Sequence, residues 1–268
     1  MTTRPPPPRP GERDDWAPPA YAPPEVLAAA PFEHGDDAYG SWLRFAVGDA
    51  AQRMRWIPPG SFAMGLSPQQ SRDLGFDDAP PQRRVTLTRG FWIADTPCTE
   101  ALWRAVMHEG PRTRRPASPW RWDKFRKFLT LLAIRVPGLE PRMPTEAEWE
   151  YACRAGTETP RYGDYHAIAW TADNCDDPQP VAGKLANAWG LYDTLGNYDE
   201  LCSDRYGPLV PEPVTDPAGA RAGAELVSRG GSYVDQYAWV VHAAARRKVD
   251  ISKTYPGVSL RLARDALP

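Results

Sequence analysis

Alternating apolar and polar residues mark the first regular part of the chain. The alternation runs over residues 41–47 and again over 52–57, with Gly48 and Asp49 between the two segments. Because successive side chains of a strand point to opposite faces, this pattern predicts a β-hairpin. A further extended segment is predicted over 61–65.

The segments that follow differ in polarity. The polar stretch 67–84 is predicted to be a surface loop, and residues 85–93 are predicted to form another strand because apolar and β-branched residues dominate there.

Three helices are predicted in the middle of the chain. Thr99 can cap the first, and the second runs from about Asp123 to just before Pro137. The third has the strongest signal, since Thr145 and Glu148 stand at the spacing of a capping box. Gly156 is expected to end that helix.

The second half of the chain has little periodicity. After Gly156 no helical pattern persists for about 80 residues, which indicates loops packed as structure. Residues 239–245 and 258–263 are the two apolar segments with strand character. The fold class that we predict is α+β, with two or three helices on short antiparallel strands and much irregular structure.

Composition supports a loop-rich domain. The 268 residues include 31 prolines, 21 glycines and 11 tryptophans, so helix breakers are frequent and large aromatic side chains supply buried area. Prolines crowd residues 1–31, and we expect this segment to be a disordered arm preceding a domain over 32–268. A flexible tether is favoured there over a ligand for a proline-recognising partner.

Charge and hydropathy limit the classes of partner. The net charge of −2 favours neither nucleic acid nor an anionic membrane, and no apolar run is long enough to span a bilayer. The N-terminus lacks the apolar core of a secretory signal, so a cytoplasmic location is expected. A basic run over 112–127, interleaved with Trp120 and Trp122, is interpreted as a solvated face rather than a nucleic-acid site.

Neither cysteine nor histidine spacing indicates a metal site. The four cysteines are widely separated and are read as reduced, partly buried thiols: Cys98, Cys153, Cys175 and Cys202. The four histidines are also scattered, with no partner ligand one helical turn away.

Several phrases resemble the motifs of one known family, in the same order. They are Ile57-Pro58-Pro59-Gly60-Ser61-Phe62-Ala63-Met64-Gly65, Arg142-Met143-Pro144-Thr145-Glu146-Ala147-Glu148-Trp149-Glu150-Tyr151-Ala152, Gly190-Leu191-Tyr192-Asp193-Thr194-Leu195-Gly196-Asn197 and Arg229-Gly230-Gly231-Ser232-Tyr233. Arg246-Arg247 and Leu260-Arg261-Leu262 complete the series. Together they resemble the formylglycine-generating enzyme family, also called sulfatase-modifying factors.

The resemblance implies a C-type-lectin-like fold with little regular secondary structure. The family includes copper-dependent formylglycine generators, a domain of iron-dependent sulfoxide synthases, pyoverdine-maturation proteins and hypervariable binding proteins. Because one fold serves such different roles, the resemblance alone leaves the function open.

Copper chemistry in the family requires two cysteines shortly after the Gly-Gly-Ser motif. The matching positions here are Asp235 and Val240, and no cysteine follows Cys202. Cu(I) prefers soft thiolate ligands, so neither copper binding nor formylglycine generation is expected.

A structural calcium ion is a second feature that the resemblance implies. The matching ligands would be the side chains of Asp193 and Glu200 and the carbonyls of Gly196 and Tyr198. Such mixed oxygen donors suit Ca²⁺, although hydrogen bonding within the loop would equally explain the two carboxylates.

The leading hypothesis is therefore a recognition module that binds a protein, a peptide or a small ligand. Its candidate ligand-binding residues combine aromatic and polar side chains, as binding surfaces do: Tyr233, Asp235, Gln236, Tyr237, Trp239, His242, Arg247 and Lys248. One alternative is a non-haem iron oxidoreductase using Asp235 and His242. Another is a non-catalytic partner subunit of a larger assembly, attached through the proline-rich arm.

Overall fold

The computed structural model describes residues 32–75, 81–119, 121–220, 222–236, 240–253 and 257–266. The predicted arm over 1–31 therefore lies outside the described residues, as do Tyr237 and Trp239 of the candidate binding surface.

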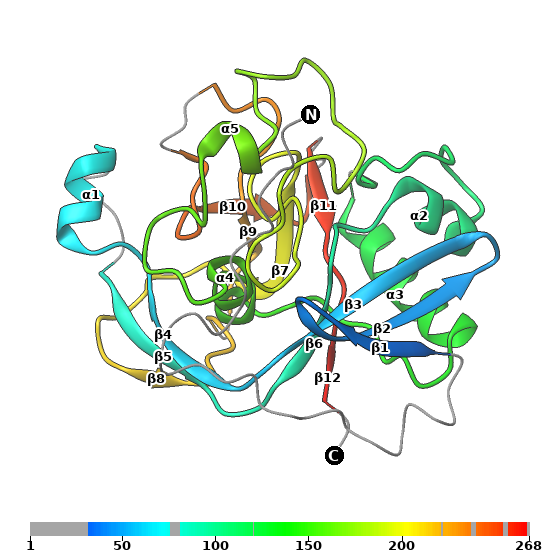
Figure 1. Ribbon diagram of the computed structural model, residues 1–268, viewed down its shortest axis with the longest axis horizontal. Coiled ribbons are helices and arrows are strands. Elements are labelled where there is room, and N and C mark those ends of the chain that lie inside the picture. The colour runs from blue at the N-terminus through cyan, green and yellow to red at the C-terminus, as the bar shows by residue number, and fades with distance from the viewer. Residues whose placement is uncertain are drawn as a thin grey trace.

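Three small sheets form the framework (Figure 1). The five-stranded sheet is antiparallel throughout, in the order β1 (Glu33–Asp37), β2 (Gly40–Val47), β3 (Ala50–Ile57), β6 (Phe91–Ala94) and β12 (Ala263–Asp265). A four-stranded sheet has the order β10 (Arg246–Asp250), β9 (Glu225–Arg229), β7 (Asp199–Arg205) and β11 (Val258–Leu260). The third contains β4 (Gly60–Met64), β5 (Arg83–Leu87) and β8 (Val214–Thr215).

Five helices accompany these sheets in the described part of the chain: α1 (Pro68–Leu74), α2 (Glu100–Met107), α3 (Trp122–Arg135), α4 (Glu146–Arg154) and α5 (Tyr165–Ile168). Helices α2 and α3 pack together beside β2 and β3, where the rings of Trp103 and Phe128 stack at 4.8 Å. Helix α4 occupies the centre of the molecule and contacts β4, β7 and β9 (Figure 1).

The elements with local signals are confirmed. The hairpin forms from β2 and β3, with Ala46 opposite Ala51. Thr99 caps α2, and the capping box of α4 is complete, since Thr145 accepts from the Glu148 N–H while Glu148 accepts from the Thr145 N–H. An α+β fold of the expected type is present.

Two segments were predicted wrongly, and a third, predicted as one strand, consists of two. Residues 67–84 are not all loop, because α1 begins after Ser67, which forms a capping box with Gln70. This helix buries no residue, so the sequence shows no apolar periodicity that would predict it. Residues 240–245 contain no strand, and β10 begins only at Arg246. The predicted strand over 85–93 is two strands, β5 and β6, which belong to different sheets.

None of the described helices is both long and apolar enough to cross a bilayer.

Candidate functional site

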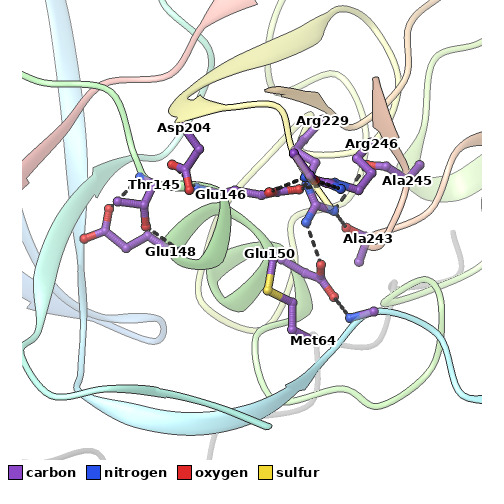
Figure 2. Close-up of polar contacts among 12 residues, drawn as sticks. Met64, Thr145, Glu146, Glu148, Glu150, Asp204, Arg229, Ala243, Ala245 and Arg246 are labelled. Atoms are coloured by element: carbon purple, nitrogen blue, oxygen red, sulfur yellow. Dashed lines mark hydrogen bonds and ion pairs between the residues drawn. The ribbon is translucent and has the colours of Figure 1, made fainter. Parts of the chain in front are cut away.

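The Arg-Gly-Gly-Ser-Tyr and Thr-Glu-Ala-Glu-Trp-Glu motifs meet in a buried ion-pair cluster (Figure 2). Arg229, at the end of β9, lies 3.0 Å from Glu146 and 2.8 Å from Glu150, both on α4. Arg246 at the start of β10 adds a second pair to Glu146 at 2.7 Å, and Arg154 a second pair to Glu150 at 2.8 Å. These five side chains are at most 7% exposed. The two motifs therefore have a structural role, which is to hold β9 and β10 against α4.

The cluster also fixes the segment that leads to β10. Arg229 donates hydrogen bonds to the carbonyls of Ala243 (2.7 Å) and Ala245 (3.2 Å). Burial alone would raise the pKa of Glu150, but Arg154 and Arg229 outweigh it and hold that pKa below its usual value. Glu150 is therefore ionised at neutral pH, and the cluster holds both ends of the loop between β9 and β10.

Two glycines set the start of this loop. Gly230 and Gly231 have φ of +101° and +76°. A Cβ on Gly230 would lie 2.7 Å from the carbonyl oxygen of Thr194, and one on Gly231 would lie 2.9 Å from Val241. Only glycine fits these positions, because a side chain would meet both steric contact and an unfavourable backbone conformation.

Arg247 connects the loop to the sheet beneath it. Its guanidinium contacts Asp199 of β7 at 2.7 Å and Asp235 of the loop at 2.6 Å. Asp235 also accepts from the N–H of Ser232, and Asp199 from that of Gly231. Burial raises the pKa of Asp199 to about 6, although Arg247 opposes the rise. We call this arrangement the Arg247 bridge.

The bridge changes the interpretation of two candidate binding residues. Asp235 and Arg247 satisfy each other's charge, so they shape the loop rather than offering a free charge to a ligand. Asp199 was not among the candidates from sequence. It lies 48 positions from Arg247 in the chain, and no local sequence pattern around either residue predicts the contact.

The copper positions of the family do not fit that metal in this chain. Asp235 offers a carboxylate already bound to Arg247, and Val240 packs against the core cluster around Trp149. No thiol of the whole sequence lies beyond Cys202. Cys153 and Cys202 are buried thiols, as expected. Burial raises the pKa of Cys153 to about 12 and holds the pKa of Cys202 well above its usual value.

His242 and Asp235 have separate surroundings. His242 is 1% exposed, and burial lowers the pKa of its imidazole to about 4, so it is neutral at pH 7. The charged groups around it are Glu150, Arg161, Arg229 and Arg154, whereas Asp235 contacts Arg247 and the Ser232 N–H. Across the described ranges, no group of three or more His, Cys, Asp or Glu side chains is arranged to hold a metal.

Two half-buried tyrosines and two exposed side chains lie together at the described start of the loop. The rings of Tyr198 and Tyr233 meet edge to face at 5.6 Å, next to Val234, which is 59% exposed, and Gln236, which is exposed. We call these four residues the recognition face. Lys248 follows Arg247 on β10 and so points to the opposite side of the sheet, with its Nζ 5.1 Å from the ring of Tyr206.

The predicted calcium ligands are close in sequence, but one has strong protein partners. Glu200 is fully buried, and its two oxygens receive hydrogen bonds from Arg261 at 2.6 and 2.8 Å and from the Trp149 indole at 2.7 Å. Asp193 accepts from the Ala182 N–H, and burial raises its pKa to about 6. Arg261 thus provides the positive charge beside Glu200, and calcium binding stays a prediction.

Known proteins share both the sequence pattern and the fold. The model of the sulfatase-modifying factor enzyme 1-like domain matches residues 45–266. A formylglycine-generating enzyme of Streptomyces coelicolor is 35% identical over 147 residues (47% of this chain and 47% of that protein). The mouse enzyme is 30% identical over 205 residues (66% and 52%). The chain thus spans about half the length of these relatives.

One solved structure extends the likeness in three dimensions. The variable protein 1 of Treponema denticola superposes with a TM-score of 0.74 at 22% identity, covering 84% of this chain and 99% of that one. Such low identity shows the shared fold alone. The family match, the fold and the buried contacts among the signature motifs agree, and the chain therefore belongs to the sulfatase-modifying factor, or formylglycine-generating enzyme, family.

Proposed function

We propose that this chain is a member of the family that does not generate formylglycine and instead binds a peptide or protein through the recognition face. The observation that carries the proposal is the replacement of two copper-binding cysteines by Asp235, held in the Arg247 bridge, and Val240, half-buried against the core. Carboxylate and isopropyl groups cannot hold Cu(I) as thiolates do.

The half-buried and exposed residues of the recognition face support binding at the same loop. Tyr198, Tyr233 and Val234 present aromatic and aliphatic surface on a backbone fixed by Gly230 and the Arg247 bridge. A rigid backbone loses little entropy on binding, and aromatic side chains provide large contact area, so this combination favours recognition.

The catalytic part of the proposal is tested with a cysteine-containing sulfatase-type peptide. The full chain is incubated with Cu(I), oxygen and reductant, and the peptide mass is followed. We expect no conversion of cysteine to formylglycine. Turnover that depends on the protein would overturn the proposal.

The binding part is tested by panning a displayed peptide library on the full chain. Peptides that bind at the face should lose at least about tenfold in affinity with Val234→Asp, because a charge replaces a desolvated contact. The matched control is Ile134→Asp on α3, since Ile134 is 69% exposed and lies outside the face. Equal loss in both variants, or none with Val234→Asp, would contradict this binding mode.

No observation specifically favours either alternative function, the iron oxidoreductase or the partner subunit. The iron hypothesis needs ligands beside Asp235 and His242, which have different neighbours among the described residues. The partner-subunit hypothesis rests on the segment over 1–31.

Calcium binding at Asp193 and Glu200 is a further proposal. Titration with CaCl₂ should raise the melting temperature of the wild type and not that of Asp193→Asn.

A further inference from the structure

A hollow of about 460 Å³ lies beside the start of α4, and none of its lining residues belongs to the loop between β9 and β10. It is bounded by the end of β5, the segment leading into α4, the loop after β8 and the end of β12. Its volume is in the range that accommodates a small molecule or an extended side chain with its backbone.

The walls of the hollow combine apolar surface with carboxylates. The apolar lining residues are Leu87, Leu129, Pro141, Met143, Pro217, Ala218 and Ala266. The acidic lining residues are Glu148, Asp216 and Asp265, against Arg142 and Arg89. Carboxylates thus outnumber guanidinium groups by one.

Arg142 offers no donor to a ligand. Its Nε contacts Asp265 at 2.8 Å, its Nη1 contacts Glu148 and the Met143 carbonyl, and its Nη2 contacts both Glu148 and Asp265 at 2.7 Å. Every nitrogen of the guanidinium is therefore directed at a protein acceptor. An incoming anion would find this cation already neutralised.

The first amides of α4 are likewise engaged. The N–H groups of Thr145 and Glu148 bind within the capping box, and that of Glu146 donates to Asp204 at 2.8 Å. These groups of the helix start are therefore unavailable to a phosphate or carboxylate.

Two carboxylates of the lining retain unused acceptor capacity. Asp265 is 67% exposed, and its contacts to Arg142 use only its Oδ1. Asp216 accepts from the N–H and hydroxyl of Thr88 and has no ion-pair partner among the described residues. Carboxylate oxygens hold up to about four lone-pair sites, so both can accept further bonds from a cation.

We propose that this hollow binds the side chain of a basic residue, lysine or arginine, presented by a peptide. The aliphatic stem would lie on the apolar lining while the charged end meets Asp216 and Asp265. This pairing follows from charge complementarity, since carboxylates outnumber guanidinium groups in the lining and Asp216 and Asp265 both retain acceptor capacity. Arg89 is exposed, has no partner among the described residues and opposes a purely cationic ligand.

The test uses the full chain, NMR titration and three capped tripeptides, with lysine, norleucine or glutamate between two glycines. The lysine peptide should shift the amide signals of Gly90 and Ala266 and bind at least about fivefold more tightly than the norleucine peptide. Cadaverine serves as a free-amine probe, because equal affinity for it would identify a small amine rather than a peptide as the ligand and overturn the peptide assignment.

Variants give the decisive comparison. Asp265→Asn and Asp216→Asn should each weaken lysine-peptide binding about two- to fivefold, and Arg89→Gln should strengthen it by a similar factor. Asp176→Asn, at an exposed carboxylate that does not line the hollow, should leave it unchanged. Tighter binding of the glutamate peptide, weaker binding with Arg89→Gln, or no shift with any peptide would overturn the proposal. Since the recognition face takes no part, its own test is independent.

Discussion

Arg229 and Glu150 form an ion pair with an N–O distance of 2.8 Å, in which each side chain is 1% exposed. The pair joins β9 to α4 (Figure 2). Buried charges are costly to leave unpaired, so loss of either member should affect the whole domain.

Replacing Arg229 by methionine should lower the free energy of unfolding by about 3–5 kcal/mol, because Glu146 and Glu150 each lose a buried partner. Urea unfolding measures the change. The control is Glu33→Gln, which removes a partner of Arg44 at the surface, where Glu33 is 66% exposed. That variant should cost less than about 1 kcal/mol. Equal costs for the two variants would contradict a structural role for the buried cluster.

Gly230→Ala should destabilise the fold by more than about 2 kcal/mol, since the new methyl meets the Thr194 carbonyl at 2.7 Å and φ is +101°. Gly48→Ala is a matched control with φ of +60° and no atom within 4 Å of the added Cβ. It should cost only about 1 kcal/mol, from the backbone conformation alone. Melting temperatures compare the two; similar losses would show that the contact with Thr194 is unimportant.

Arg247→Gln should loosen the loop between β9 and β10, because Asp199 and Asp235 would then repel each other without the cation between them. We expect faster hydrogen exchange at the Gly231 and Ser232 amides and a loss of about 2–4 kcal/mol of stability. Lys248→Gln, whose side chain is 57% exposed on the other side of the sheet, should change neither. Unchanged exchange in Arg247→Gln would rule out the bridge as the determinant of loop conformation.

The stability of the fold should depend on pH through the carboxyl group of Asp204. Burial raises its pKa to about 6 from the ordinary 3.8. A folded state that binds the proton more tightly gains stability below pH 3.8 and loses it as the pH rises through 6. Asp204→Asn cannot ionise, so relative to wild type it should gain about 1–3 kcal/mol between pH 4 and pH 7.5. Unfolding in urea at both pH values tests this, and a constant difference would contradict it.

The sequence was sufficient where the determining contacts are local. The capping box of Thr145 and Glu148 and the β2–β3 hairpin involve neighbours, and both are confirmed. Helix α1 was missed because it buries nothing, and β9 because its neighbours β7 and β10 lie on either side of it at a distance along the chain.

The candidate site was only partly predictable for the same reason. The loop and its lost cysteines can be read from the sequence, since Gly230 and Gly231 mark its start. The role of Asp235 depends on Arg247, 12 positions later, and that of Arg247 on Asp199, 48 positions earlier. Whether a carboxylate faces a ligand or a guanidinium is decided by such distant pairings.

The place of β6 between β3 and β12 has a consequence for biosynthesis. The Ala94 carbonyl accepts from Arg261, and Ile93 pairs with Ala263, so one edge of β6 receives its partners about 170 positions later. At 5–20 residues per second, a ribosome needs on the order of ten seconds or more to supply them. During that interval the hairpin and β6 can associate, but their exposed edge stays available for wrong pairing. Nascent chains of this protein should therefore depend on chaperone protection until β12 has emerged.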